Sequence, residues 1–193
     1  MSSANWFSTI SRRFNQGAPM SEPVLSVDWP AYHRLVERLA AQIHESGYRF
    51  DSLLCLARGG LRPGDVLSRI FDVPLAILAA SSYRAAGGTV QGELDIARYI
   101  TTTGADLHGR LLLVDDLADT GATIERVRVH LRQRYPAITE IRTAVLWVKE
   151  GARVAPEYAV MRLPDRPWIR QPFEIYDDMQ PEEVCRRVHG AAE

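Results

Sequence analysis

The sequence predicts an α/β protein with a mostly parallel central sheet flanked by helices. Short apolar runs, typical of strands buried on both faces, alternate along the chain with longer segments of helical periodicity. Strands that alternate with helices favour crossover connections, and therefore parallel pairing. In such sheets ligands bind beyond the carboxyl ends of the strands. The functional site is therefore expected where apolar runs end in polar residues.

The first part of the chain predicts a short edge strand and then a long helix. Val24 to Val27 are mostly apolar, and Asp28 before Trp29-Pro30 is typical of a helix N-cap followed by an early proline. An apolar stripe at helical spacing continues to Gly47, where the helix is expected to end. The next elements expected are a strand over 53–57, a helix over 63–70 and a strand over 75–79.

The second part repeats the alternation. Residues 95–101 alternate moderately and predict a strand, and the apolar run 111–114 predicts a central strand buried on both faces. A helix is expected from Thr123 to about Arg134. The remaining elements expected are strands over 144–148 and 158–161 and a C-terminal helix that contains Cys185.

The composition excludes several classes of protein. The chain has 193 residues, which suits one domain, and its formal net charge of −1 comes from interspersed acidic and basic residues, which argues against nucleic acid as a partner. Two cysteines argue against a disulfide scaffold, and no apolar run approaches the ~18 residues of a membrane span. We therefore expect a cytoplasmic protein with no membrane span.

Residues 1–22 differ in composition from the rest. Residues 1–21 contain no acid, and aromatic side chains recur there at helix-like spacing, which mildly resembles a transit peptide or a membrane-surface helix. The simpler interpretation is a disordered N-terminal extension. The domain is then expected to span residues 23–193.

The stretch from Leu111 to Thr123 is the most informative of the chain. An apolar run ends in the acidic pair Asp115-Asp116, and Asp119-Thr-Gly-Ala-Thr then leads into the next helix. Backbone N–H groups at a helix N-terminus attract phosphate, and threonine hydroxyls add donors. The paired carboxylates can accept hydrogen bonds from a diol or help to hold a hydrated Mg²⁺. Phosphate, diol and metal together describe a ribose phosphate.

This stretch resembles the phosphoribosyl pyrophosphate (PRPP) signature of the type I phosphoribosyltransferases. The resemblance runs from about Val27 to Asp178 and implies the type I fold, with a small hood over the active site formed by roughly 151–178 and the N-terminal segment. It implies that Asp115 and Asp116 bind the ribose hydroxyls and Mg²⁺. It also implies that Asp119 is the general acid/base at purine N7, although a turn or cap aspartate is the alternative. The ribose-5-phosphate set is Asp115, Asp116, Asp119, Thr120, Gly121, Ala122 and Thr123.

Residues 57–64 offer a second anion site just past an expected strand. Glycines let the backbone approach an anion closely, and Arg58 offers a charged fork to diphosphate oxygens, although Arg-Gly-Gly alone is often an ordinary turn. The segment resembles the pyrophosphate loop of bacterial xanthine-guanine phosphoribosyltransferases. The resemblance implies pyrophosphate binding by Arg58 and Gly59, a catalytic role for Arg58, and a cis peptide between Ala57 and Arg58.

Residues 81–88 predict a mobile loop, because small residues and paired glycines impose little structure. The family resemblance implies a catalytic flexible loop in which Ser81, Ser82 and Tyr83 cover pyrophosphate and exclude water. A plain surface hairpin is the alternative.

The base-binding residues are implied by the resemblance to the same xanthine-guanine enzymes. Lys149 would donate to the exocyclic oxygen of a 6-oxopurine, although a lysine after a strand is more often a solvated charge. Trp168 would stack on the purine instead of packing within the hood. The carbonyl of Ile169 would face the 2-position, and Glu174 would bind the base edge.

The hood departs from the family pattern in three places. Arg170 stands where those enzymes carry an acid, Phe173 replaces a tryptophan, and Glu174 replaces an aspartate. One methylene can move a carboxylate far enough to change base choice by a factor of about 10 or more. The choice among guanine, xanthine and hypoxanthine therefore stays open.

The sequence thus predicts a Mg²⁺-dependent purine phosphoribosyltransferase that joins a 6-oxopurine to PRPP and releases pyrophosphate. Its partners would be these small molecules, and the family resemblance implies a homodimer or homotetramer. The alternatives are a PRPP-sensing regulator without catalysis and a phosphoribosyltransferase for a non-purine base.

Overall fold

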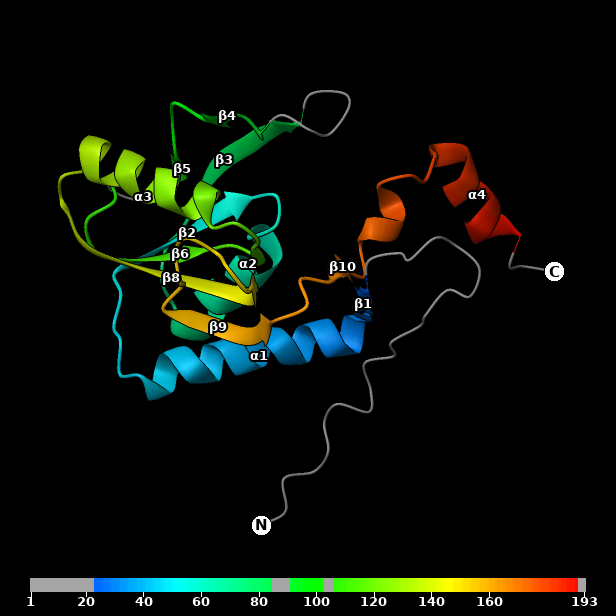
Figure 1. Cartoon of the computed structure of the whole chain (residues 1–193), viewed down its shortest axis with the longest axis horizontal. Helices are drawn as coiled ribbons and strands as arrows, with labels where there is room; N and C mark the ends of the chain where they lie inside the picture. Colours follow the sequence, from blue (N-terminus) through cyan, green and yellow to red (C-terminus); the bar gives the residue numbers. More distant parts are fainter. Residues whose placement is uncertain (1–22, 85–90, 103–105, 191–193) are drawn as a thin grey trace, which may run out of the picture. The chain divides into compact units, whose positions relative to one another are not determined.

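The structure, a computed structural model, describes residues 23–84, 91–102 and 106–190 (Figure 1). The expected N-terminal extension lies outside these residues, as do residues 85–88 of the predicted mobile loop. The chain divides into two units, one of Met1–Arg34 with Pro167–Glu193 and one of Leu35–Arg166. Each unit is described by itself below.

The larger unit contains an eight-stranded, mostly parallel sheet of order β4-β3-β2-β6-β8-β7, with β5 beside β3 and β9 beside β8. The pairs β2–β3, β2–β6, β6–β8, β7–β8 and β8–β9 are parallel, and only β4 and β5 pair antiparallel, both with β3, among the described strands. The predicted fold class is therefore confirmed. The strands are β2 Ser52–Ala57, β3 Leu75–Arg84, β4 Gln91–Ile96, β5 Thr101–Thr102, β6 Gly109–Val114, β7 Leu117–Ala118, β8 Ile138–Lys149 and β9 Tyr158–Leu163.

Helices cover both faces of this sheet. Helix α3, Ala122–Arg134, contributes Ile124, Val127 and Leu131 to a core cluster that also contains Leu54 and Leu56 of β2. Helix α2, Leu61–Phe71, packs on the opposite face of the sheet. Because successive side chains of a strand point to opposite faces, burial on both faces explains why the central strands are apolar throughout.

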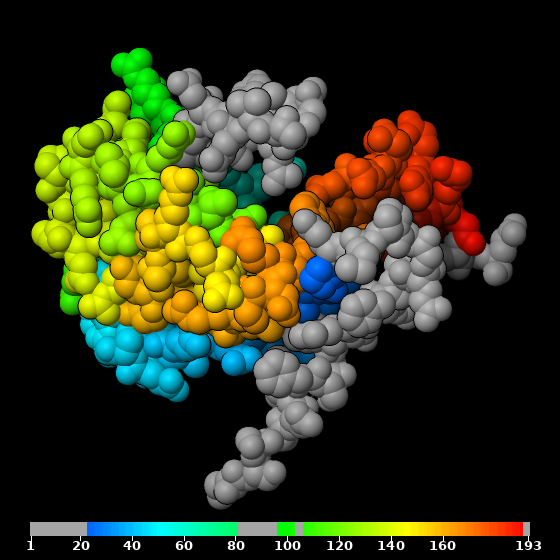
Figure 2. Space-filling model, in the orientation of Figure 1, coloured from blue at the N-terminus to red at the C-terminus, as the bar shows by residue number. Residues whose placement is uncertain are grey.

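Helix α1, Trp29–Glu45, begins in the smaller unit and continues into the larger one. Its residues Leu35, Leu39 and Ile43 are fully buried, which confirms the predicted apolar stripe. In Figures 1 and 2 this part of α1 lies beside β9, on the side away from α3.

The smaller unit joins the two ends of the described chain. Strand β1, Val24–Ser26, pairs in parallel with β10, Trp168–Arg170. The Asp28 carboxylate accepts a hydrogen bond from the Ala31 amide at 2.8 Å, which confirms the predicted N-cap. The unit also contains the 3₁₀ helix η2, Glu174–Tyr176, and helix α4, Pro181–His189, whose residues are all exposed.

The strand predictions over 95–101 and 75–79 were wrong, and two short strands were missed. The strand expected over 95–101 is instead split between β4 and β5, because both pair antiparallel with β3 and the chain bends between them. Strand β3 continues to Arg84, beyond its expected end at 79, since β4 provides a partner for that extension. The short strands β7 and β10 were not expected, because two or three residues carry no periodicity.

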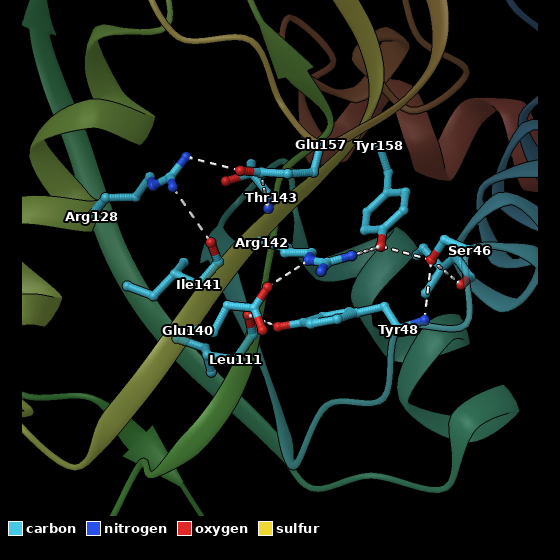
Figure 3. A network of polar contacts seen from close by, with 11 residues as sticks. Ser46, Tyr48, Leu111, Arg128, Glu140, Ile141, Arg142, Thr143, Glu157 and Tyr158 are labelled. Carbon is cyan, nitrogen blue, oxygen red and sulfur yellow. Dashed lines mark hydrogen bonds and ion pairs between the residues drawn. The ribbon is translucent and has the colours of Figure 1, made fainter.

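A polar network supports the first half of β8 (Figure 3). The Arg142 guanidinium lies 4.1 Å from the ring centroid of Tyr48 and donates to Glu140 at 2.7 Å and to the Tyr158 hydroxyl at 3.0 Å. The Tyr158 hydroxyl also bonds to Ser46 at 2.8 Å. These contacts join the end of α1 to β8 and β9, and so fix the strand that ends at Lys149.

The packing of α2 gives a prediction about stability. Alanine usually stabilises a helix relative to glycine by about 1 kcal/mol. At Gly64, however, a Cβ would lie 1.9 Å from Cys55 Sγ and 3.3 Å from Leu53 Cδ2, both in the core. We therefore expect Gly64→Ala to lower the free energy of unfolding by about 1–3 kcal/mol in urea denaturation.

The matched control is the double variant Gly64→Ala/Cys55→Ala. It removes the sulfur at 1.9 Å and leaves contacts of 3.3 Å with Leu53 Cδ2 and 3.5 Å with the Cβ of residue 55, so it should recover most of the loss. A Gly64→Ala protein as stable as the wild type would contradict the described packing of α2 on β2.

Candidate functional site

The polar residues singled out in the larger unit meet at one edge of the sheet. Arg58 follows β2, the Asp115-Asp116 pair follows β6, Asp119 follows β7, and Lys149 is the last residue of β8. These four strands are neighbours and run in parallel. Their carboxyl ends therefore lie together, as the sequence predicted.

The Asp119–Thr123 segment forms a compact turn into α3. Gly121 has φ of +76°, which suits glycine, and α3 begins at Ala122, one residue before its expected start. The Thr120 carbonyl accepts a hydrogen bond from the Arg153 amide at 2.8 Å. This bond holds the loop 119–123 against the segment that follows β8. The N–H groups in the first turn of α3 point toward the same loop.

The acidic pair lies close to the Arg58 loop. The Asp116 amide donates to Asp115 Oδ1 at 3.0 Å, and a Cβ on Gly59 would come within 2.3 Å of Asp116 Oδ1. Only a glycine at position 59 therefore leaves room for the Asp116 carboxylate in this position. The Ala57–Arg58 peptide is cis, as the family resemblance implied.

Ionisation of the Asp115 carboxyl group is electrostatically unfavourable. Burial raises its pKa well above the usual range, and the neighbouring Asp116 carboxylate raises it further, against the lowering effect of the Asp116 amide. An ionised Asp115 is therefore stabilised by any cation or hydrogen-bond donor that binds there.

Asp119 contacts two cationic side chains. Lys149 Nζ lies 3.4 Å from Asp119 Oδ2, and Arg166 Nη2 donates to Asp119 Oδ1 at 2.5 Å. Arg166 Nη1 also donates to the main-chain oxygen of Glu150. Lys149 is buried, with 9% of its surface exposed, so it is not the solvated edge charge of the alternative interpretation.

Arg166 was missed in the sequence. It follows β9 in a proline-flanked turn, where a charged residue is ordinarily a solvated surface group. Its contact with Asp119 joins residues 47 positions apart, so no local pattern predicts it.

A cavity of about 480 Å³ borders the end of β8. It is lined by Lys149, Glu150 and Arg162 together with apolar and small residues of 148–155 and 163–164. This volume falls within the range of small-molecule sites. The strand end that carries Lys149 is therefore open to a space large enough for a small ligand.

The proposed base-stacking residues belong to the smaller unit. Trp168 is 47% exposed on β10, Ile169 is buried opposite Leu25, and Glu174 is the first residue of η2. The ring of Phe173 lies 6.2 Å from that of Trp29, so the residue that replaces the family's tryptophan packs within this unit.

The Ser81–Tyr83 segment is part of a strand, and residues 85–88 of the predicted mobile loop lie outside the described residues. Its backbone belongs to β3, with Ser81 opposite Asp95 and Ser82 opposite Leu94 on β4, and the register shifts between Ser82 and Arg84. Antiparallel pairing with β4 therefore places residues that carry no strand periodicity within a strand.

Two further observations apply to all the described residues. Within the described residues, no group of three or more His, Cys, Asp or Glu side chains is placed to hold a metal ion. In the same part of the chain, no helix is long and apolar enough to cross a membrane.

Comparison with known proteins decides the family. The model of the phosphoribosyl transferase domain matches residues 27–178. The chain belongs to the phosphoribosyltransferase family. A curated xanthine-guanine phosphoribosyltransferase of Nitratidesulfovibrio vulgaris is 28% identical over 152 residues, which are 78% of this chain and 85% of that protein.

Solved structures of phosphoribosyltransferases share the fold. A purine phosphoribosyltransferase from Pyrococcus horikoshii is 32% identical with a TM-score of 0.64, over 78% of this chain and 93% of that one. The xanthine-guanine-hypoxanthine enzyme of Helicobacter pylori is 21% identical with a TM-score of 0.65, over 80% and 97% of the two chains. The predicted type I fold is confirmed.

The raised pKa of Asp115 predicts how the free energy of unfolding depends on pH. An acid whose pKa is higher in the folded state than in the unfolded state favours folding when protonated. Its contribution is fully present below the unfolded pKa and is lost as the pH rises through the folded pKa. We therefore expect Asp115→Asn to melt at a higher temperature than the wild type at pH 7 in metal-free buffer, and the difference to shrink toward pH 4.

The control is Asp65→Asn, which removes an exposed carboxylate on α2 that is 52% accessible. Such a surface change should alter the free energy of unfolding by less than about 0.5 kcal/mol. Equal melting temperatures for wild type and Asp115→Asn across this pH range would contradict the raised pKa of Asp115.

Proposed function

We propose that the protein transfers the 5-phosphoribosyl group from PRPP to a 6-oxopurine and releases pyrophosphate. The observation that carries this proposal is the Lys149–Asp119 pair, with 3.4 Å between Nζ and Oδ2, next to the turn 119–123. A carboxylate accepts the proton of purine N7–H, and an ammonium group donates to O6. The pair therefore suits two neighbouring atoms on one edge of a 6-oxopurine. The names of the Nitratidesulfovibrio and Pyrococcus relatives support a purine as the base.

The proposed PRPP site uses the remaining residues of the sheet edge. The turn 119–123 and the first N–H groups of α3 would bind the 5′-phosphate, and the carboxylates after β6 would bind the ribose hydroxyls. Arg58, Gly59 and the residues 81–83 would bind the leaving pyrophosphate. The reaction passes through a ribosyl cation, so these residues act mainly by positioning and by placing charge.

We propose that Mg²⁺ takes part in this site. Asp115 and Asp116 fit a hydrated Mg²⁺, because they supply two adjacent carboxylates and because a bound cation would offset the unfavourable ionisation that raises the pKa of Asp115. When bound there, Mg²⁺ neutralises charge on the pyrophosphate group. The carboxylates of the chain hold and orient it, and PRPP oxygens and water would complete the ligand set.

We propose further base contacts in the smaller unit. The exposed indole of Trp168 offers a flat face for stacking, the Ile169 carbonyl would bind the 2-position, and Glu174 would bind the base edge. Glu174 in place of an aspartate leaves the order of guanine, xanthine and hypoxanthine to experiment. The family resemblance supports a homodimer or homotetramer. The two cysteines, which argue against a disulfide scaffold, support a cytoplasmic location.

The assay measures pyrophosphate release from PRPP and Mg²⁺ with guanine, xanthine, hypoxanthine, adenine, orotate or uracil supplied separately. Release with a 6-oxopurine supports the proposal and ranks the bases. Release only with orotate or uracil would retain the PRPP site but overturn the roles of Lys149 and Trp168. PRPP binding without release for any base would favour a regulator.

Asp119→Asn tests the acid/base role. The amide retains the shape of the side chain but does not accept the N7 proton, so we expect turnover to fall by about 100-fold or more. PRPP affinity, measured by calorimetry, should stay close to that of the wild type. Near-normal turnover would leave Asp119 with a turn or cap role only.

Lys149→Met tests recognition of the 6-position. Methionine preserves most of the volume of this buried side chain but removes the donor to O6. We expect kcat/KM for 6-oxopurines to fall by about 10-fold or more, because a charged hydrogen bond is lost. Any activity with adenine should change much less, and equal losses for both bases would mean that Lys149 does not bind O6.

A further inference from the structure

We propose that Arg166 is a positioning residue that fixes the separation between Asp119 and Lys149 and thereby aligns them with the N7–O6 edge of the base. This inference rests on the proposed 6-oxopurine transfer and adds a residue to it. Arg166 touches Asp119 and the main chain next to Lys149, and it acts through them.

The contacts of Arg166 explain how it would set this separation. One guanidinium nitrogen donates to Asp119 Oδ1 at 2.5 Å, and the other donates to the main-chain oxygen of Glu150. The guanidinium is planar and rigid, so the separation of its two nitrogens is constant. The Asp119 carboxylate and the peptide that follows Lys149 are therefore held at a defined distance.

The Glu150 peptide is held from both sides. Its amide donates to the Leu163 carbonyl at the end of β9, at 3.0 Å, and its oxygen accepts from Arg166. Arg166 itself has φ of +45°, in the left-handed region that non-glycine residues adopt uncommonly. The loops after β7, β8 and β9 thus meet at one side chain.

The contacts of Arg166 and Lys149 give the two carboxylate oxygens of Asp119 different roles. Arg166 bonds to Oδ1, and Lys149 faces Oδ2. When Lys149 donates to O6 of a base, the neighbouring N7 lies beside Oδ2. Oδ2 is then the oxygen that exchanges the proton with N7, and Oδ1 is the oxygen that holds the carboxylate in orientation.

The Arg166–Asp119 ion pair contributes little to the free energy of unfolding. Both side chains are 44% exposed, and ion pairs at such sites stabilise proteins weakly. The Arg166–Asp119 contact can therefore be broken without unfolding the protein, which allows its effect on turnover to be measured.

The test compares Arg166→Gln and Arg166→Lys with a matched control, Arg69→Gln. Arg69 also pairs with an aspartate, Asp65, at 3.1 Å on the exposed surface of α2. We expect Arg166→Gln to lower kcat for the 6-oxopurine by about 10- to 100-fold, because a small misplacement of a catalytic group costs about that much. KM for PRPP should stay within about two-fold, and all melting temperatures within about 2 °C of the wild type. Arg69→Gln should retain normal kcat.

Two further measurements separate positioning from a structural role. Arg166→Lys should recover only part of kcat, since one ammonium group does not reproduce a fork to two partners. In the Asp119→Asn protein, Arg166→Gln should cost almost nothing more, because Arg166 acts through that carboxylate.

Normal kcat in Arg166→Gln would overturn the inference, as would independent, multiplicative losses in the double variant. A lower KM for the base with unchanged kcat would also overturn it, because Arg166 would then compete with the base. Any of these results beside an active wild type would leave the proposed function intact. A wild type inactive with every base would overturn the proposed function, and this role of Arg166 with it.

Discussion

Parallel pairing of β2, β6, β8 and β7 is the constraint on which the site depends. Parallel strands run in one direction, so the residues that follow them meet at one edge of the sheet. The register, with Leu54 opposite Leu113 and Leu113 opposite Thr143, is strongly specified because both faces of these strands are buried. A slip of one residue would turn every side chain to the other face. The same hydrophobic packing that stabilises the fold therefore also sets which polar groups meet at the edge.

The charged side chains at this edge form two groups, one of like charges and one of opposite charges. Asp115 and Asp116 place like charges side by side in a partly buried position, which raises the pKa of Asp115 and favours a bound cation or donor. Asp119 instead lies between Lys149 and Arg166, which keeps opposite charges in contact. The acidic pair is thus suited to binding, and the Asp119 cluster is suited to holding reactive groups in place. Both groups use residues that lie at or just after the ends of strands in the sheet.

The two units carry different functional groups. The larger unit carries the turn 119–123, the acidic pair and the Asp119 cluster, and its polar network around Arg142 and Tyr158 secures the strand that ends at Lys149. The smaller unit is built by pairing β1 with β10, and it presents the exposed face of Trp168 on that short strand. Phe173 packs on Trp29 and Tyr32 within it, so the departure from the family pattern at this position is accommodated by aromatic contacts.

The amino-acid sequence by itself determined the fold class, the long helices, the central strands and the residues at the strand ends. These features arise from local periodicity and from turn chemistry, as at Asp28 and Gly121, which act over a few residues. Only the tertiary structure decided the pairing of β3 with β4 and β5, the short strands β7 and β10, and the partners of Asp119. Strand β3 extends to Arg84 because β4 pairs with it, and Arg166 reaches Asp119 because β7, β8 and β9 run in parallel. Such contacts join residues far apart in the chain, and a local pattern carries no information about them.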